Sequence, residues 1–97
     1  MTILKKAKAG ELLVFDVRPA EEFVSGHLPH AYSLPLDELQ KRLSELPKDL
    51  PVVAYCRGPF CLMAKDAVAL MRKNGYRALH LTDGVAEWRA RGLLVEA

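Results

Sequence analysis

Two cysteines, Cys56 and Cys61, stand close together and are the residues whose types and spacing best suit chemistry. They enclose the segment Cys56-Arg57-Gly58-Pro59-Phe60-Cys61. A disulfide across so short a loop would do little to stabilise a fold. The spacing of the two cysteines and the three dispersed histidines does not match a zinc or iron–sulfur site. We therefore expect the thiols to serve reactions rather than a disulfide framework, and we expect no metal and no cofactor.

Cys56 has the position of a nucleophile. It directly follows the apolar run Pro51–Tyr55, which predicts a strand, and it precedes a helix predicted over Leu62–Lys73. A tight loop between a strand and a helix points backbone N–H groups into one concavity. These amides, the positive end of the helix and Arg57 would favour the thiolate, so we expect a lowered pKa for Cys56. The simpler interpretation, an ordinary buried cysteine, is less favoured by this position.

The rest of the chain alternates short strands with helices. Strands are predicted at residues 12–17, 31–34, 51–55 and 77–81, and helices at residues 20–24, 37–46, 62–73 and 85–91. Asp37 is expected to cap the second helix, and Gly75 to end the third. This alternation predicts a single α/β domain over residues 1–97, with a mainly parallel sheet and helices on both faces. The segment Ile3–Ala9 begins so abruptly that a preceding strand or domain could be missing.

Composition excludes several classes of partner. The 97 residues, 51% of them hydrophobic, suffice for one core, and the net charge of +2 is scattered along the chain. This balance indicates no direct nucleic-acid binding and no membrane binding. No apolar run approaches the roughly 18 residues of a membrane span, and the start lacks the apolar stretch of a secretory signal. We expect a soluble, cytoplasmic domain.

Five separate segments resemble the rhodanese homology domain, the fold of thiosulfate and other sulfurtransferases. In chain order they are Phe15-Asp16-Val17-Arg18 with Glu22-Phe23, Gly26-His27-Leu28-Pro29 with Ala31, Val52 to Cys56, Gly75-Tyr76, and Asp83-Gly84 with Trp88 and Gly92. The resemblance implies a five-stranded, mainly parallel sheet with helices on both sides, and a persulfide on Cys56. It also implies the transfer of sulfur from thiosulfate, a persulfide or a polysulfide to cyanide or a thiol.

The loop departs from the common pattern of this family at two positions. Pro59 stands where a glycine is usual and removes an N–H donor, and Cys61 stands where an arginine is common and removes a guanidinium. We therefore expect thiosulfate to be a poor donor. The loop resembles the variant in rhodanese domains fused to ArsR-type winged-helix repressors, which implies a fused or separate regulatory protein domain as a partner.

The expected site stays close to Cys56, the catalytic residue. The predicted substrate-binding residues are Arg57, Gly58, Pro59, Phe60, Cys61 and Leu62. Cys61 has three interpretations: a packing residue, a resolving thiol that attacks the Cys56 persulfide, or a second thiol for a soft ligand. Asp16, Arg18 and His27 are expected to support the structure rather than to transfer protons.

Two other functions compete with sulfur transfer. Dual-specificity cell-cycle phosphatases share the rhodanese fold, but no basic residue follows Arg57 until Lys65, so phosphate would lack its guanidinium clamp. The stronger alternative is a dithiol module, formed by Cys56 and Cys61, that senses redox state, reactive sulfur or metalloids. Such a module would act on a partner regulatory domain.

Overall fold

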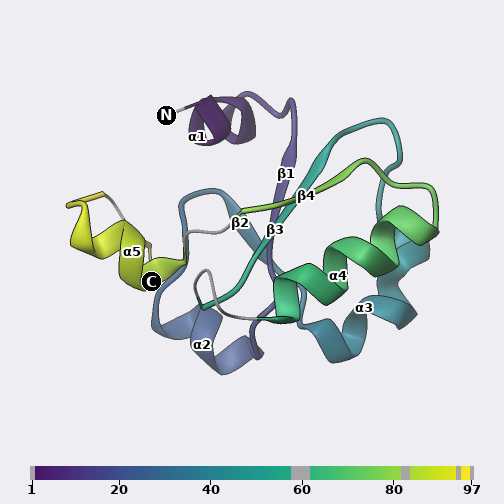
Figure 1. Cartoon of the computed structure of the whole chain (residues 1–97). Helices are drawn as coiled ribbons and strands as arrows, with labels where there is room; N and C mark the ends of the chain where they lie inside the picture. Colours follow the sequence, from purple (N-terminus) through teal and green to yellow (C-terminus); the bar gives the residue numbers. More distant parts are fainter. Residues whose placement is uncertain (1, 58–61, 82–83, 94, 97) are drawn as a thin grey trace.

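The computed structural model describes residues 2–57, 62–81, 84–93 and 95–96. These residues form a parallel sheet with the strand order β2-β1-β3-β4 (Figure 1). The strands are β1 (Leu13–Asp16), β2 (Ala31–Ser33), β3 (Val52–Tyr55) and β4 (Ala78–His80). Because all three pairs are parallel, the carboxyl ends of the strands lie at one edge of the sheet. At this edge Asp16 is the register partner of both Ser33 and Tyr55.

Helices cover both faces of the sheet. They are α1 (Thr2–Lys8), α2 (Ala20–Ser25), α3 (Leu36–Arg42), α4 (Leu62–Lys73) and α5 (Val85–Ala90), and the 3₁₀ turn η1 (Leu43–Glu45) follows α3. Figure 1 shows α3 and α4 together on one side of the sheet, with α1 and α5 on the other. None of the helices in the described ranges is long and apolar enough to cross a membrane.

Two hydrophobic clusters fix this layered arrangement. Along β3, Val52 and Ala54 belong to the cluster that contains the buried side chains of α3 and α4, whereas Val53 and Tyr55 belong to the cluster that contains those of α5. Successive side chains of a strand point to opposite faces, so a strand covered on both faces must be apolar throughout. All four residues of β3 are buried, which explains why its sequence is an unbroken apolar run.

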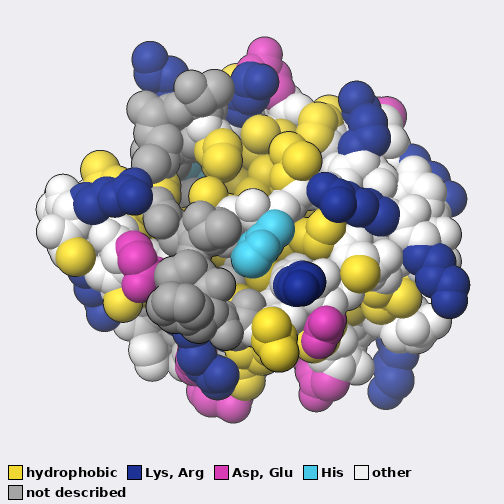
Figure 2. Space-filling model, viewed as in Figure 1, with side chains coloured by type: hydrophobic (Ala, Val, Ile, Leu, Met, Phe, Trp, Pro, Cys, Tyr) yellow, Lys and Arg dark blue, Asp and Glu magenta, His cyan; other side chains and the backbone are white. Residues whose placement is uncertain are grey.

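The predicted class is confirmed: the fold is α/β, with a parallel sheet covered on both faces. The prediction of five strands was wrong, because the described residues form four. The first described segment forms α1, which the sequence pattern did not predict, and its Ile3 and Ala7 pack one turn apart against the cluster on that face. β4 is an edge strand in this sheet, and its Leu79 is 55% exposed. Figure 2 shows hydrophobic side chains gathered on the face over β1 and β4.

Helix boundaries follow local chemistry. α4 has the predicted bounds, and Gly75 after it has a φ of +90°, a left-handed conformation that favours glycine. The predicted cap of α3 was wrong, because the helix begins at Leu36 directly after Pro35. Proline has the backbone angle that suits a helix start. Asp37 instead lies in the first turn, where its charge complements the helix dipole.

Candidate functional site

Cys56 directly follows Tyr55, the last residue of the interior strand β3. It is 1% exposed and belongs to the same apolar cluster as Val17, Leu34 and Ala64. In this structure Cys56 is disulfide-bonded. The residue is therefore held at the carboxyl edge of the sheet, where α/β folds bind their ligands.

The loop after Cys56 falls partly within the described residues. Arg57 is described, as is Leu62, the first residue of α4, which is 66% exposed. The other predicted substrate-binding residues lie outside the described ranges: Gly58, Pro59, Phe60 and Cys61. Their place in the site stays a prediction, and so do the three interpretations of Cys61.

Arg57 is bound by a carboxylate of α2. Its Nε donates to Glu22 Oε1 at 2.9 Å and its Nη2 donates to Glu22 Oε2 at 2.6 Å. These hydrogen bonds hold the pKa of Glu22 below its ordinary 4.5. The guanidinium that was predicted to bind substrate is thus already paired. The sequence did not predict this pairing, because no spacing rule connects two residues 35 positions apart.

Gly84 lies directly against the backbone of Cys56 and Arg57. A Cβ atom at this position would stand 2.7 Å from the Cys56 carbonyl oxygen and closer still to the Arg57 carbonyl group. Its φ of −109° suits any residue, so the close approach alone requires glycine here. The backbone N–H of Gly84 donates to Glu87 Oε1 at 2.7 Å, which fixes the start of α5 beside the cysteine.

A buried network of polar side chains lies at the carboxyl ends of β1 and β3. Asp16, which is 0% exposed, accepts hydrogen bonds from the Arg18 backbone N–H and guanidinium and, at 2.9 Å, from the Tyr55 hydroxyl. Arg18 also donates to the Gly26 carbonyl at 2.7 Å, and the Leu28 N–H donates to the Tyr55 hydroxyl at 3.0 Å. Burial, and next the Asp16 charge, raise the pKa of Tyr55, so its hydroxyl stays a neutral donor. The network ties the strand ends to the loop after α2.

The contacts of His27 are with Phe23 of α2 and with Glu96. Its Nδ1 lies 2.9 Å from the Phe23 carbonyl oxygen, and its ring stacks on the Phe23 ring at 3.8 Å between centroids. Its backbone forms an antiparallel bridge with Glu96, at 2.7 and 2.9 Å. These contacts order the turn after α2 and attach the last described residue to it.

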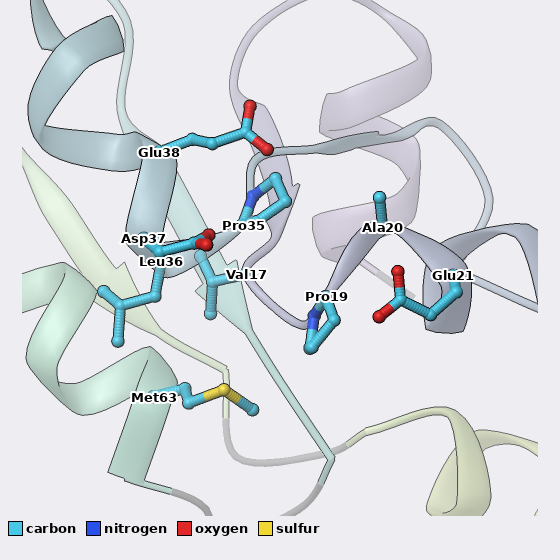
Figure 3. Close-up of a pocket in the computed structure, with 9 residues that line it drawn as sticks. All are labelled: Val17, Pro19, Ala20, Glu21, Pro35, Leu36, Asp37, Glu38 and Met63. Carbon is cyan, nitrogen blue, oxygen red and sulfur yellow. The ribbon is translucent and has the colours of Figure 1, made fainter.

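A cavity of about 480 Å³ opens between α2, α3 and the start of α4 (Figure 3). Its apolar lining consists of Val17, Pro19, Ala20, Pro35, Leu36 and Met63. The cavity lies at the carboxyl edge of the sheet, where the Val17 N–H donates to the Tyr55 carbonyl at 3.1 Å and Met63 packs against the cluster that contains Cys56. Cys56 follows β3 at this same edge of the sheet.

Three carboxylates complete the lining of this cavity, namely Glu21 of α2 and Asp37 and Glu38 of α3. Figure 3 shows the side chains of Glu21 and Glu38 extending toward each other from the two helices. Within the described ranges, no three or more His, Cys, Asp or Glu side chains are grouped so that they could hold a metal ion.

Two curated relatives are similar to almost the whole of this chain. The HTH-type transcriptional regulator Rv0324 of Mycobacterium tuberculosis is 48% identical over 94 residues, which cover 97% of this chain and 42% of the regulator. The chain thus spans less than half of that protein. A sulfurtransferase of Allochromatium vinosum is 36% identical over 92 residues, which cover 94% of this chain and 84% of that protein.

Solved structures and a family model both match almost the whole of the chain. A crystal structure of a Bacillus halodurans protein has a TM-score of 0.86 at 31% identity and covers 99% of this chain and 72% of its own. A Lactobacillus plantarum protein has a TM-score of 0.88 at 25% identity, over 99% of this chain and 83% of its own. The family model described as a rhodanese-like domain matches residues 2–91. With a parallel sheet and a cysteine at its carboxyl edge, this chain belongs to the rhodanese family.

Proposed function

We propose that this domain is a sulfurtransferase that carries sulfane sulfur as a persulfide on Cys56. The observation that carries the proposal is the position of Cys56, directly at the carboxyl end of an interior parallel strand. The family and the relative named a sulfurtransferase support the reaction class. The donor is a small sulfur compound, the acceptor is cyanide or a thiol, and the reaction needs no organic cofactor.

The reaction has two half-reactions. In the cytoplasm, where we propose that the domain works, a cellular thiolate first attacks the sulfur to which Cys56 is bonded; it forms a mixed disulfide with that sulfur, and Cys56 leaves as a thiolate. The Cys56 thiolate then attacks the outer sulfur of a persulfide, polysulfide or thiosulfate. A new S–S bond forms while the donor's thiolate or sulfite leaves with the bonding electrons. Finally, cyanide or a thiolate attacks the terminal sulfur and releases the Cys56 thiolate, so we expect ping-pong kinetics.

Intact mass spectrometry tests this proposal directly. The reduced protein is exposed to thiosulfate or to glutathione persulfide, beside its Cys56→Ser and Cys61→Ser variants. We expect a gain of one sulfur atom that requires Cys56, survives in Cys61→Ser and disappears on addition of cyanide. A sulfur adduct that remains in Cys56→Ser, or no adduct with any donor in Cys61→Ser, would refute the transferase function.

One observation favours a second function: Cys56 is disulfide-bonded in this structure. If Cys61 is the resolving thiol, it attacks the inner sulfur of the Cys56 persulfide, expels hydrosulfide and forms a disulfide with Cys56. The domain would then report reactive sulfur, oxidants or metalloids to a fused or separate regulatory domain. The relative that is named a transcriptional regulator supports such a partner.

The same two variants separate the two functions. A transferase loses turnover with Cys56→Ser and keeps much of it with Cys61→Ser, whereas a dithiol sensor loses its response with either change. The readout is the mass after exposure to persulfide. Loss of two protons in the parent, with a lasting sulfur adduct only in Cys61→Ser, would favour the sensor.

A further inference from the structure

The cavity at the carboxyl edge of the sheet is lined by charges of one sign. The lining residues that carry charge are Glu21, Asp37 and Glu38, and the described lining includes no lysine or arginine. Arg42 is the cation that approaches them, with its Nη1 3.7 Å from Glu38 Oε1, but this pair is half-exposed and therefore weak. A cleft lined by one sign of charge, with apolar walls, focuses the field on whatever enters it.

The cation nearest to Cys56 in sequence does not offset this field. The Arg57 guanidinium donates two hydrogen bonds to Glu22, so the pair is neutral as a unit. An oxyanion that approached Cys56 along this edge of the sheet would pass the three carboxylates of the cavity, and it would find the Arg57 guanidinium already paired with Glu22. Thiosulfate has its negative charge close to the sulfur that must be attacked.

Acidic residues in the first turns of α2 and α3 also have an ordinary structural role, because they complement the positive ends of the helix dipoles. That role does not remove their charge from the cavity. Figure 3 shows that the Glu21 and Glu38 side chains point toward the hollow rather than away from it.

We infer that this cavity selects sulfur donors and acceptors by charge, admitting thiols and persulfides with neutral or cationic groups near the sulfur and excluding dianions such as thiosulfate. The inference rests on the proposed function, since it names the substrate class of the same site. Glu21, Asp37 and Glu38 act as specificity-determining residues and take no part in bond making.

Thiol–disulfide exchange tests the charge preference without requiring sulfur transfer. The reduced Cys61→Ser protein, whose thiol is Cys56, is reacted with cystamine, hydroxyethyl disulfide and dithiodiglycolate, which are a dication, a neutral molecule and a dianion. In each reaction the Cys56 thiolate attacks one sulfur, a mixed disulfide forms and a small thiolate leaves. Rate constants are divided by those of free cysteine with the same reagents.

Two triple variants with the same change of charge provide the comparison. Glu21→Gln/Asp37→Asn/Glu38→Gln neutralises the cavity, whereas Glu11→Gln/Asp49→Asn/Asp66→Asn neutralises three exposed carboxylates that do not line it. We expect the cystamine-to-dithiodiglycolate rate ratio to fall about tenfold in the first variant and to stay unchanged in the second. Glu21 is exposed on α2, so the single variant Glu21→Gln should fold even where the triple variant folds poorly. We expect it to lower the same rate ratio.

The outcomes separate this inference from the proposed function. An unchanged ratio in both Glu21→Gln and the cavity variant, or an equal fall in the control variant, would overturn charge selection even if Cys56 carries sulfur. A reduced ratio in a protein that forms no persulfide would instead uphold charge selection and refute the transferase.

Discussion

Glu22 of α2 and Arg57, the residue after Cys56, form a two-point ion pair with N–O distances of 2.9 and 2.6 Å. The pair attaches the first residue of the reactive loop to a helix and occupies the guanidinium closest in sequence to the thiol. Arg57 thereby holds the loop to α2, and its guanidinium becomes available to a substrate only when this pair is broken.

Glu22→Gln is therefore expected to speed the reaction of Cys56 with thiosulfate. The freed guanidinium could bind the sulfonate oxygens, and an exposed charge contact of this kind corresponds to roughly a two- to fivefold increase in rate. The rate of persulfide formation, followed by intact mass in the Cys61→Ser background, measures the effect. The double variant Glu22→Gln/Arg57→Gln should lose the gain, and a gain that persists without Arg57 would contradict this explanation.

The same pair is expected to weaken in acid. Because the hydrogen bonds from Arg57 lower the pKa of Glu22 in the folded protein, the pair stabilises the fold above the ordinary value of 4.5. This stabilisation is lost as the pH falls through the lower, folded-state pKa. Urea unfolding of the parent and of Glu22→Gln between about pH 3 and pH 7 should show a stability difference that shrinks at the acid end. A difference that stays constant over that range would count against the pair.

Asp16→Asn is expected to destabilise the fold by about 3–5 kcal/mol, because it leaves the buried Arg18 guanidinium without its counter-charge. The free energy of unfolding in urea measures the loss. Asp49→Asn, an exposed change of the same chemistry, should alter stability by less than about 0.5 kcal/mol. A loss below about 1 kcal/mol for Asp16→Asn would mean that the hydrogen-bond network of Asp16 contributes little to the free energy of unfolding.

Tyr55→Phe should cost about 2 kcal/mol, since it removes a hydrogen bond to the Asp16 carboxylate and leaves the buried Leu28 N–H without its acceptor. Tyr32→Phe removes the same hydroxyl from a residue that is 58% exposed and is the matched control. Equal stabilities of the two variants in urea would argue against the hydrogen bonds of Tyr55.

Much of the fold could be predicted from the sequence because its periodic elements are strong. The twelve residues of α4 have a clear apolar face and end before a glycine, and their predicted bounds match. The run Val52–Tyr55 is apolar throughout because both faces of β3 are covered. α1 was missed because Lys5, Lys6 and Lys8 dominate a segment of seven residues, and its helical state depends on the packing of Ile3 and Ala7.

The contacts around Cys56 could not be predicted in the same way. Position alone pointed to Cys56, since the end of an apolar run before a helix is a local signal. The pairing of Glu22 with Arg57 and the approach of Gly84 to the Cys56 backbone depend on how helices and loops pack, and no spacing along the chain encodes them. The cavity carboxylates come from two helices and meet only in the folded protein.

Gly84→Ala is expected to disturb both stability and the reactive cysteine. The added Cβ would overlap the backbone carbonyls of Cys56 and Arg57, which are not flexible side-chain ends, so the strand–loop junction must shift. Overpacking of this kind costs about 1–3 kcal/mol. Urea unfolding measures that cost, and the alkylation rate of the reduced thiol in the Cys61→Ser background measures the displacement of Cys56.

Gly10→Ala is the matched control for this change. Gly10 has a φ of +76° and open space around its Cα, so alanine there strains the backbone without touching the site. Both variants should lose stability, but only Gly84→Ala should change the alkylation rate. An unaltered rate in Gly84→Ala would show that the loop absorbs the added methyl group, and Gly84 would then have no part in positioning Cys56.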